Sequence, residues 1–206
     1  MNTRHVAVLG GPRERPAPPG VDPEEFRLAL LEDTYEVVAG LEFVTPVLVV
    51  PPQGDRDAEA ITWPGTTVVR AATLSEIFTE LHRLGAEQAA LVAPDAPDLP
   101  PLLIGKLLRA LGSAPAAATP SAGGGLVALG TRLPLPDWLS GALTAVDLDT
   151  EDALARLRAA APRPGLVPTA PGWHRLKDPG DVAYLDPGLE GWDNTRALLA
   201  GRPLAR

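Results

Sequence analysis

The chain has 206 residues, of which 45% are hydrophobic and 21% charged, and its formal net charge of −8 comes from 18 basic and 26 acidic side chains. This composition is typical of a folded chain with a core of its own, and it provides no large basic surface for a nucleic acid. The absence of cysteine excludes disulfides, thiolate zinc sites and thiol nucleophiles. No stretch reaches the length of a membrane span and the first apolar run is too short for a signal peptide, so we expect a cytoplasmic protein that binds neither membranes nor nucleic acid.

Apolar runs alternate with helix signals along the chain. The expected strands are apolar runs that end at turn residues, and they span residues 5–9, 47–50, 67–70, 89–93, 116–119, 125–129 and 144–146. The expected helices have capping residues or helical apolar spacing, and they span residues 23–39, 74–84, 102–111, 151–160 and 195–199. Because strands alternate with helices, the connections are crossovers, and we expect an α/β fold with a mostly parallel mixed sheet flanked by helices.

The amino-acid composition changes after Pro162. The remaining residues are rich in proline and glycine and carry Trp173 and Trp192 among turn signals. We therefore expect residues 1–161 to form one α/β domain and residues 162–206 to form an extended C-terminal arm. Its aromatic side chains favour packing on its own domain, and packing on a partner subunit or over a ligand is the alternative.

Aspartates follow two of the expected strands directly. Asp95 and Asp98 come after residues 89–93, and Asp147 and Asp149 come after residues 144–146. Ligands bind at the carboxyl edge of open α/β sheets, and carboxylates together with substrate phosphates are the ligands that Mg²⁺ prefers. Asp98 fits better as the N-cap of the following helix, and Asp149 lies where the N-cap of the next helix belongs, so cap and metal ligand are both open for Asp149.

Glycines stand at two loops that follow strands, and arginines lie close to the first of them. The glycines are Gly10, Gly11, Gly123, Gly124 and Gly125, and the arginines are Arg13 and Arg15. Backbone N–H groups in such loops approach phosphate oxygens closely, and arginine adds charge-assisted donors. Simple turns and solvated loop charges are the alternatives.

Four segments carry a family resemblance. They are Arg-Leu-Ala-Leu-Leu-Glu-Asp-Thr at 27–34, Leu-Val-Ala-Pro-Asp-Ala-Pro-Asp-Leu at 91–99, Gly-Gly-Gly-Leu-Val-Ala-Leu at 123–129 and Val-Asp-Leu-Asp-Thr-Glu-Asp at 146–152. Over about residues 5–160 the chain resembles the phospholactate guanylyltransferase-like family of deazaflavin-coenzyme biosynthesis and its glycosyltransferase-like relatives. The resemblance implies the glycosyltransferase-A type, nucleotide-diphospho-sugar transferase-like fold. It also implies that Asp95, Asp147 and Asp149 are magnesium ligands and that Gly123 to Gly125 form a substrate or nucleotide loop.

The resulting hypothesis is a transferase that depends on Mg²⁺ or Mn²⁺. Asp95, Asp147 and Asp149 would be its catalytic metal ligands, a nucleotide or nucleotide sugar and a small acceptor its partners, and a homodimer its assembly. The alternative is a noncatalytic member that binds a nucleotide or a partner protein, because related nucleotidyltransferases carry a lysine in the N-terminal loop and this chain has none before Lys106. Since clustered carboxylates repel one another, we expect Asp95→Asn to keep or raise the melting temperature of the unliganded protein.

Overall fold

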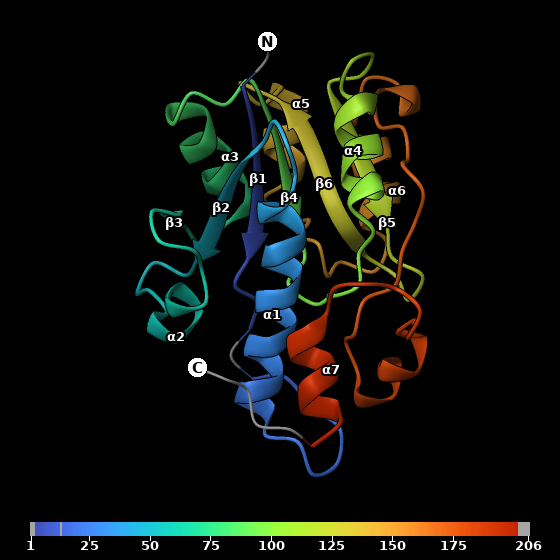
Figure 1. The fold of residues 1–206 in the computed structure, drawn as a ribbon. Helices are drawn as coiled ribbons and strands as arrows, with labels where there is room; N and C mark the ends of the chain where they lie inside the picture. Colours follow the sequence, from blue (N-terminus) through green and yellow to red (C-terminus); the bar gives the residue numbers. More distant parts are fainter. Residues whose placement is uncertain (1–2, 13, 202–206) are drawn as a thin grey trace.

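A mixed sheet of six strands forms the centre of the protein in the computed structural model, which describes residues 3–12 and 14–201 (Figure 1). The strands are β1 (Arg4–Leu9), β2 (Thr45–Val50), β3 (Thr67–Arg70), β4 (Gln88–Val92), β5 (Ala116–Pro120) and β6 (Leu126–Arg132). Their order is β3-β2-β1-β4-β6-β5, in which β6 runs antiparallel to β4 and β5 while β1, β2, β3 and β4 pair in parallel. The expected fold class, a mostly parallel mixed sheet, is confirmed.

Helices cover both faces of the sheet (Figure 1). They are α1 (Pro23–Ala39), α2 (Arg56–Ala60), α3 (Leu74–Arg83), α4 (Pro101–Ala110), α5 (Asp137–Ala142), α6 (Ala153–Ala160) and α7 (Asp193–Leu199), with 3₁₀ turns at Pro164–Leu166 and Pro179–Tyr184. Helices α1 and α3 begin at the capping residues that the sequence predicts. Asp22 accepts the N–H groups of Glu24 and Glu25, and Thr73 forms a reciprocal capping box with Glu76. None of the described helices is long and apolar enough to cross a membrane.

Successive residues of each strand pack in two separate hydrophobic cores, because side chains alternate between the two faces of a sheet. On β1, Ala7 packs in the core with α3, α5 and α6, while Val6 and Val8 pack in the core with α1 and α4. Both faces are therefore buried. This explains why the parallel strands are almost continuously apolar in the sequence.

The strand expected at residues 144–146 is wrong. The segment is the turn that ends α5, in which the N–H of Leu143 donates to Leu139 and that of Thr144 donates to Gly141. Val146 is buried, but its side chain packs in the core beneath the helices and does not extend the sheet. The apolar residues correctly indicate a buried segment, but three residues are too few to distinguish a strand from a buried turn. Helices α2 and α5 were not expected from the sequence.

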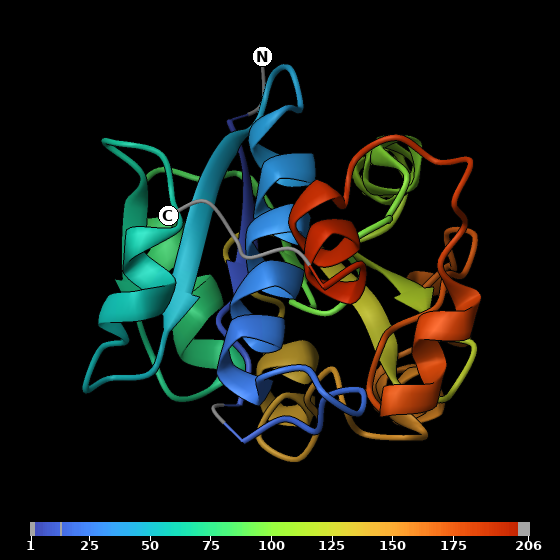
Figure 2. The ribbon, with the colours of Figure 1, turned by 60° about the horizontal axis from the view of Figure 1, so that its bottom comes forward.

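Residues 162–201 lie against the edge of the sheet and against α1. Single parallel bridges join Ala118 to Thr169 and Ser121 to Trp173, so the arm covers the outer edge of β5. Further along, α7 packs beside α1, as Figure 2 shows. A third hydrophobic core forms there, and its buried members are Phe26, Ala29, Leu30, Leu176, Leu185, Trp192 and Leu198. The arm is thereby built into the same body as the sheet.

Candidate functional site

The strand order creates a switch point between β1 and β4. From β1 the chain passes to β2 on one side, and after β3 it returns to β4 on the other side. The loops that follow β1 and β4 therefore diverge at the carboxyl edge of the sheet, which is where open α/β sheets bind ligands. The start of the antiparallel β6 lies at the same edge, where the N–H of Ala93 donates to Val127 at 2.8 Å. The segment 121–125 comes to this edge with it.

Asp95 is fully buried at this switch point and is held by two arginines. Its Oδ1 accepts from Nε of Arg175 at 2.6 Å, and its Oδ2 accepts from Nη2 of Arg175 at 3.0 Å and from Nη2 of Arg15 at 2.6 Å. Burial alone would raise the pKa of Asp95, but the charges and hydrogen bonds of Arg175 and Arg15 together hold it below its ordinary value. The carboxylate is therefore ionised and neutralised by the protein itself.

Arg175 uses every donor of its guanidinium inside the protein. Besides Asp95, its Nη2 contacts Oδ1 of Asp149 at 2.7 Å, and its Nη1 donates to the carbonyls of Leu126 at 3.1 Å and Leu148 at 3.0 Å. With Nε on Asp95, these contacts account for all five N–H groups of an arginine. Burial alone would lower the pKa of Arg175, but Asp95 and Asp149 together raise it.

Asp95, Arg15, Arg175 and Asp149 form an ion cluster. Asp147 does not join it, although the sequence places Asp147 close to Asp149. Its Oδ1 accepts the N–H of Asp149 at 2.9 Å, the N–H of Thr150 at 2.7 Å and the hydroxyl of Thr150 at 2.9 Å. An aspartate that bonds to the backbone two and three residues further on closes a turn. Asp147 therefore shapes the loop that presents Asp149. Of the two roles left open for Asp149, that of N-cap is wrong, because the N-cap of α6 is Asp152.

A divalent cation does not fit the carboxylates in this arrangement. Within residues 3–12 and 14–201, no three metal-ligating side chains lie together. Asp95 and Asp149 do converge, since both contact the same nitrogen of Arg175, but a guanidinium stands at the point of convergence. A metal ion there would need Arg175 to leave.

Both glycine loops lie at the same edge, and in each loop the packing and backbone conformation of the protein itself require glycine. Gly11 has φ +72°, and a Cβ there would lie 2.8 Å from Cγ of Pro94. Gly125 has φ +75°, and a Cβ there would overlap the carbonyl oxygen of Leu148. Only glycine fits these positions without strain. Gly10, Gly123 and Gly124 lie in the same two loops, while Arg13 lies outside the described residues.

The C-terminal arm brings basic side chains to the site that were not predicted. Besides Arg175, the arm contributes Lys177, whose Nζ donates to the carbonyl of Gly124 at 3.0 Å and lies 3.9 Å from Oδ1 of Asp149. The signal for these side chains in the sequence is the presence of three basic residues within positions 174–177. The role of the arm had been predicted from its aromatic side chains alone.

Asp98 anchors the arm and does not cap a helix. It accepts from Nε1 of Trp173 at 3.1 Å and from Nε2 of His174 at 3.0 Å. The expectation that Asp98 is the N-cap of the next helix is wrong, since that position belongs to Pro100, which provides no side-chain bond. The arm is thus tied to the loop after β4 just before Arg175, and it is tied again just after Arg175, where the N–H of Leu176 donates to the carbonyl of Asp95 at 2.8 Å.

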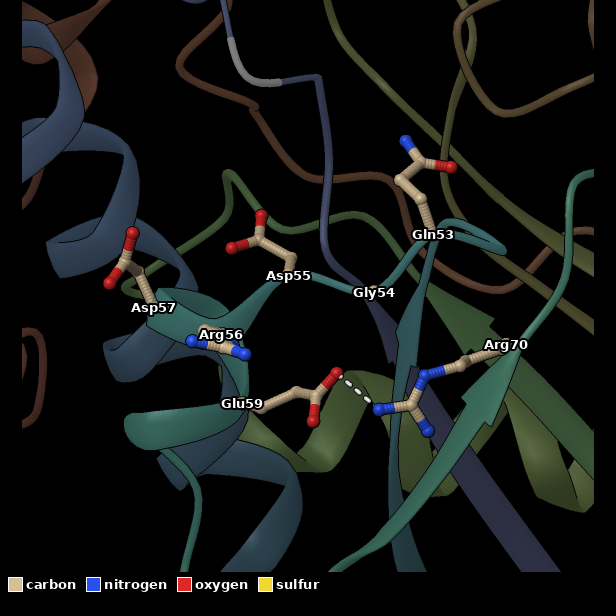
Figure 3. Close-up of a pocket in the computed structure, with 7 residues that line it drawn as sticks. All are labelled: Gln53, Gly54, Asp55, Arg56, Asp57, Glu59 and Arg70. Atoms are coloured by element: carbon tan, nitrogen blue, oxygen red, sulfur yellow. Dashed lines mark hydrogen bonds and ion pairs between the residues drawn. The ribbon is translucent and has the colours of Figure 1, made fainter.

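One cavity is lined in part by Arg175, and a second lies away from the cluster at the ends of β2 and β3. One of about 220 Å³ lies between the second glycine loop and the arm, and its lining residues are Ser121, Ala122, Gly123, His174, Arg175, Lys177, Asp178, Asp181 and Tyr184. The other, of about 520 Å³, lies beyond β2 and β3, where Glu59 and Arg70 point toward each other and pair at 2.6 Å (Figure 3). Arg27 connects this second cavity to the first glycine loop, because it contacts Asp55 at 3.2 Å and donates to the carbonyl of Gly10 at 3.2 Å.

No protein family model and no curated protein matches this chain, but solved structures match it along nearly its whole length. A Desulfovibrio desulfuricans protein described as a proposed nucleotide-diphospho-sugar transferase is 18% identical, with 100% of both chains covered and a TM-score of 0.67. A 4-diphosphocytidyl-2C-methyl-D-erythritol synthase from Anaerococcus prevotii is 13% identical over 97% of this chain and 96% of that chain, with a TM-score of 0.60. The manganese complex of Rv0371c from Mycobacterium tuberculosis is 18% identical over 97% and 98%, with a TM-score of 0.54. This likeness establishes the fold, which is that of nucleotide-diphospho-sugar transferases.

Proposed function

We propose that this protein binds a nucleoside triphosphate or a nucleotide sugar at the carboxyl edge of its sheet and transfers a nucleotidyl or glycosyl group to a small acceptor. The observation that carries the proposal is the meeting of the Gly10–Gly11 loop, Arg15 and Asp95 at the switch point between β1 and β4. Open α/β sheets bind ligands at such points. The cytidylyl-type synthase among the proteins of the same fold supports nucleotidyl transfer as the chemistry.

The phosphates of the ligand would meet fixed cations at this edge. Arg15 uses one N–H of each terminal nitrogen on Asp95 and Leu176, which leaves other donors of its guanidinium for a phosphate. Lys177 donates one N–H to Gly124 and has two more, and it supplies from the arm the lysine charge that the N-terminal loop lacks. Positioning and charge neutralisation are the main contributions of a protein to this kind of transfer.

The acceptor would occupy the cavity of about 220 Å³ between the second glycine loop and the arm. This volume is below the roughly 300–1,000 Å³ of pockets for drug-sized ligands, so it admits only a smaller acceptor. The hydroxyls of Ser121 and Tyr184 and the ammonium of Lys177 line it. A phosphorylated acceptor and a guanine nucleotide are the specific pair that the family resemblance suggests. The sites assigned from the sequence belong to the same proposal, and they are Gly123 to Gly125 for substrate and Gly10, Gly11, Arg13 and Arg15 for phosphate.

The metal dependence expected from the family rests on Asp95, Asp147 and Asp149. The manganese complex of Rv0371c supports a divalent cation in a protein of this fold. In this chain the carboxylates are taken by arginines and by a turn, so no step of the transfer is derived through a metal ion. The same observation favours a second candidate function, a noncatalytic nucleotide-binding protein, because the buried charge of Asp95 is already neutralised by Arg15 and Arg175.

The test uses the two lysines of the chain as a matched pair. Nucleoside triphosphates and nucleotide sugars, guanosine triphosphate among them, are screened by thermal shift, because a ligand that binds only the native state raises its stability. We expect a shift with at least one of them, a loss of most of that shift in Lys177→Gln, and an unchanged shift in Lys106→Gln, whose lysine is exposed on α4. Product formation with small acceptors then separates the transferase from the noncatalytic protein. A wild-type protein that no nucleotide stabilises would refute both forms of the proposal.

A further inference from the structure

The side chains of Asp95 and Asp149 converge on one nitrogen atom. Nη2 of Arg175 lies 3.0 Å from Oδ2 of Asp95 and 2.7 Å from Oδ1 of Asp149, although the two aspartates come from loops on opposite sides of β6 in the chain. Two carboxylates from separate loops that meet at a point are the usual protein contribution to a magnesium or manganese site. Here the point is occupied by a guanidinium whose side chain is only 2% exposed.

We propose that Arg175 is the resident cation of this site, delivered by the C-terminal arm to the position between Asp95 and Asp149, so that the native protein binds no divalent cation there. The guanidinium satisfies what the buried carboxylate of Asp95 requires, which is a positive charge and two directed donors. It differs from a metal ion in being covalently part of the chain, so chelators do not remove it. It also has no open coordination position for a substrate oxygen.

The arm holds this guanidinium firmly in place. On the C-terminal side of Arg175, the N–H of Leu176 donates to the carbonyl of Asp95 at 2.8 Å, and the carbonyl of Leu176 accepts from Arg15. On the N-terminal side, Trp173 and His174 both bond to Asp98. The backbone around Arg175 is therefore clamped to the loop after β4 at several points, and exchange of the side chain for a hydrated ion would require the arm to detach.

A consequence follows for the ligand, and it rests on the proposed function. All donors of Arg175 are used within the protein, so a phosphate at this edge would be met by Arg15 and Lys177 and not by Arg175. Nucleotide binding should then be the same with a chelator and with magnesium. The metal part of the inference stands separately, because it concerns the protein and the metal ion alone.

The experiment measures binding of Mn²⁺ alone, by the loss of its electron paramagnetic resonance signal. Wild-type protein should bind no Mn²⁺ at the site, whereas Arg175→Met removes the guanidinium, frees oxygens of both aspartates and should gain one Mn²⁺ per chain, bound at least about tenfold more tightly than any nonspecific Mn²⁺ on the wild type. Arg175→Met combined with Asp149→Asn should lose the gained site. Arg156→Met is the matched control, because Arg156 is an exposed arginine of α6 and its loss should change nothing.

Two outcomes would overturn the inference. One is a wild-type protein that binds one Mn²⁺ per chain and loses it in Asp149→Asn, and the other is a folded Arg175→Met that gains no Mn²⁺ site. If Arg175→Met does not fold alone, Arg175→Gln is the second variant, and Mn²⁺ should raise its melting temperature while leaving that of the wild type unchanged. Failure of nucleotide binding in all of these proteins would count against the proposed function only.

Discussion

At the scale of single residues, Asp95 acts as the centre of a buried ion cluster. It is fully buried, and its two oxygens accept three hydrogen bonds from Arg15 and Arg175. The sequence had suggested the opposite environment, three carboxylates that repel one another until a metal ion arrives. The structure therefore reverses the expected sign of a substitution at this position.

We predict that Asp95→Asn lowers the free energy of unfolding by about 3–5 kcal/mol, because it removes the buried negative charge between two buried guanidinium groups and leaves Arg175 with only the carboxylate of the exposed Asp149. Chemical denaturation at neutral pH measures the change. Asp152→Asn is the control, since Asp152 pairs with Arg156 at 2.6 Å on the exposed surface of α6, where such a pair contributes about 1 kcal/mol or less. An unchanged or raised stability of Asp95→Asn would show that the arginines do not depend on this carboxylate.

At the scale of elements, a side chain of α1 caps the start of α7. Asp33 accepts the N–H and the side-chain amide of Asn194, both at 3.0 Å, and the N–H of Thr195 at 2.7 Å. These donors are among the unpaired N–H groups of the first turn of a helix. Asp33 thus joins two helices that are more than 150 residues apart in sequence, and burial raises its pKa to about 6 in spite of these bonds.

This raised pKa predicts a dependence of stability on pH. The folded pKa of about 6 exceeds the ordinary 3.8, so the folded state binds the proton more tightly than the unfolded state, and stability from Asp33 is lost as the pH rises through about 6. The unfolding free energy of the wild type relative to Asp33→Asn should fall by up to about 3 kcal/mol between about pH 4 and about pH 7. Denaturation curves at several pH values test this, with Asp137→Asn, an exposed aspartate of α5, as the control. A difference that stays flat with pH would contradict it.

At the scale of the whole molecule, the sequence predicted what local signals encode. The N-cap at Asp22, the capping box at Thr73 and the apolar runs of the strands led to the fold class, to the six strands of the described sheet with one strand too many, and to most of the described helices. The failures concern packing between distant segments. Nothing within the arm indicates that Arg175 will meet a carboxylate 80 positions earlier, and the turn at residues 144–146 resembles a strand because both bury apolar side chains.

The packing of the arm therefore determines whether the ion cluster around Asp95 forms. Trp192 is 6% exposed in the core between the arm and α1, and its ring also stacks under the guanidinium of Arg196 at 4.3 Å. Removing so large a buried side chain typically costs about 3–5 kcal/mol. Because this core also contains Leu176, the neighbour of Arg175, loosening it should loosen the ion cluster as well.

We predict that Trp192→Ala lowers the unfolding free energy by about 3–5 kcal/mol and keeps a single transition, since the arm and the sheet share buried side chains. Trp63→Ala is the matched control, because Trp63 is 52% exposed and its edge contact with Tyr35 is worth about 1 kcal/mol. Far-ultraviolet circular dichroism and amide hydrogen exchange at residues 173–177 report the sheet and the arm separately. If the arm loses its protection in Trp192→Ala while the sheet unfolds at the wild-type midpoint, the arm is a detachable cover, and Arg175 then leaves Asp95 whenever the cover opens.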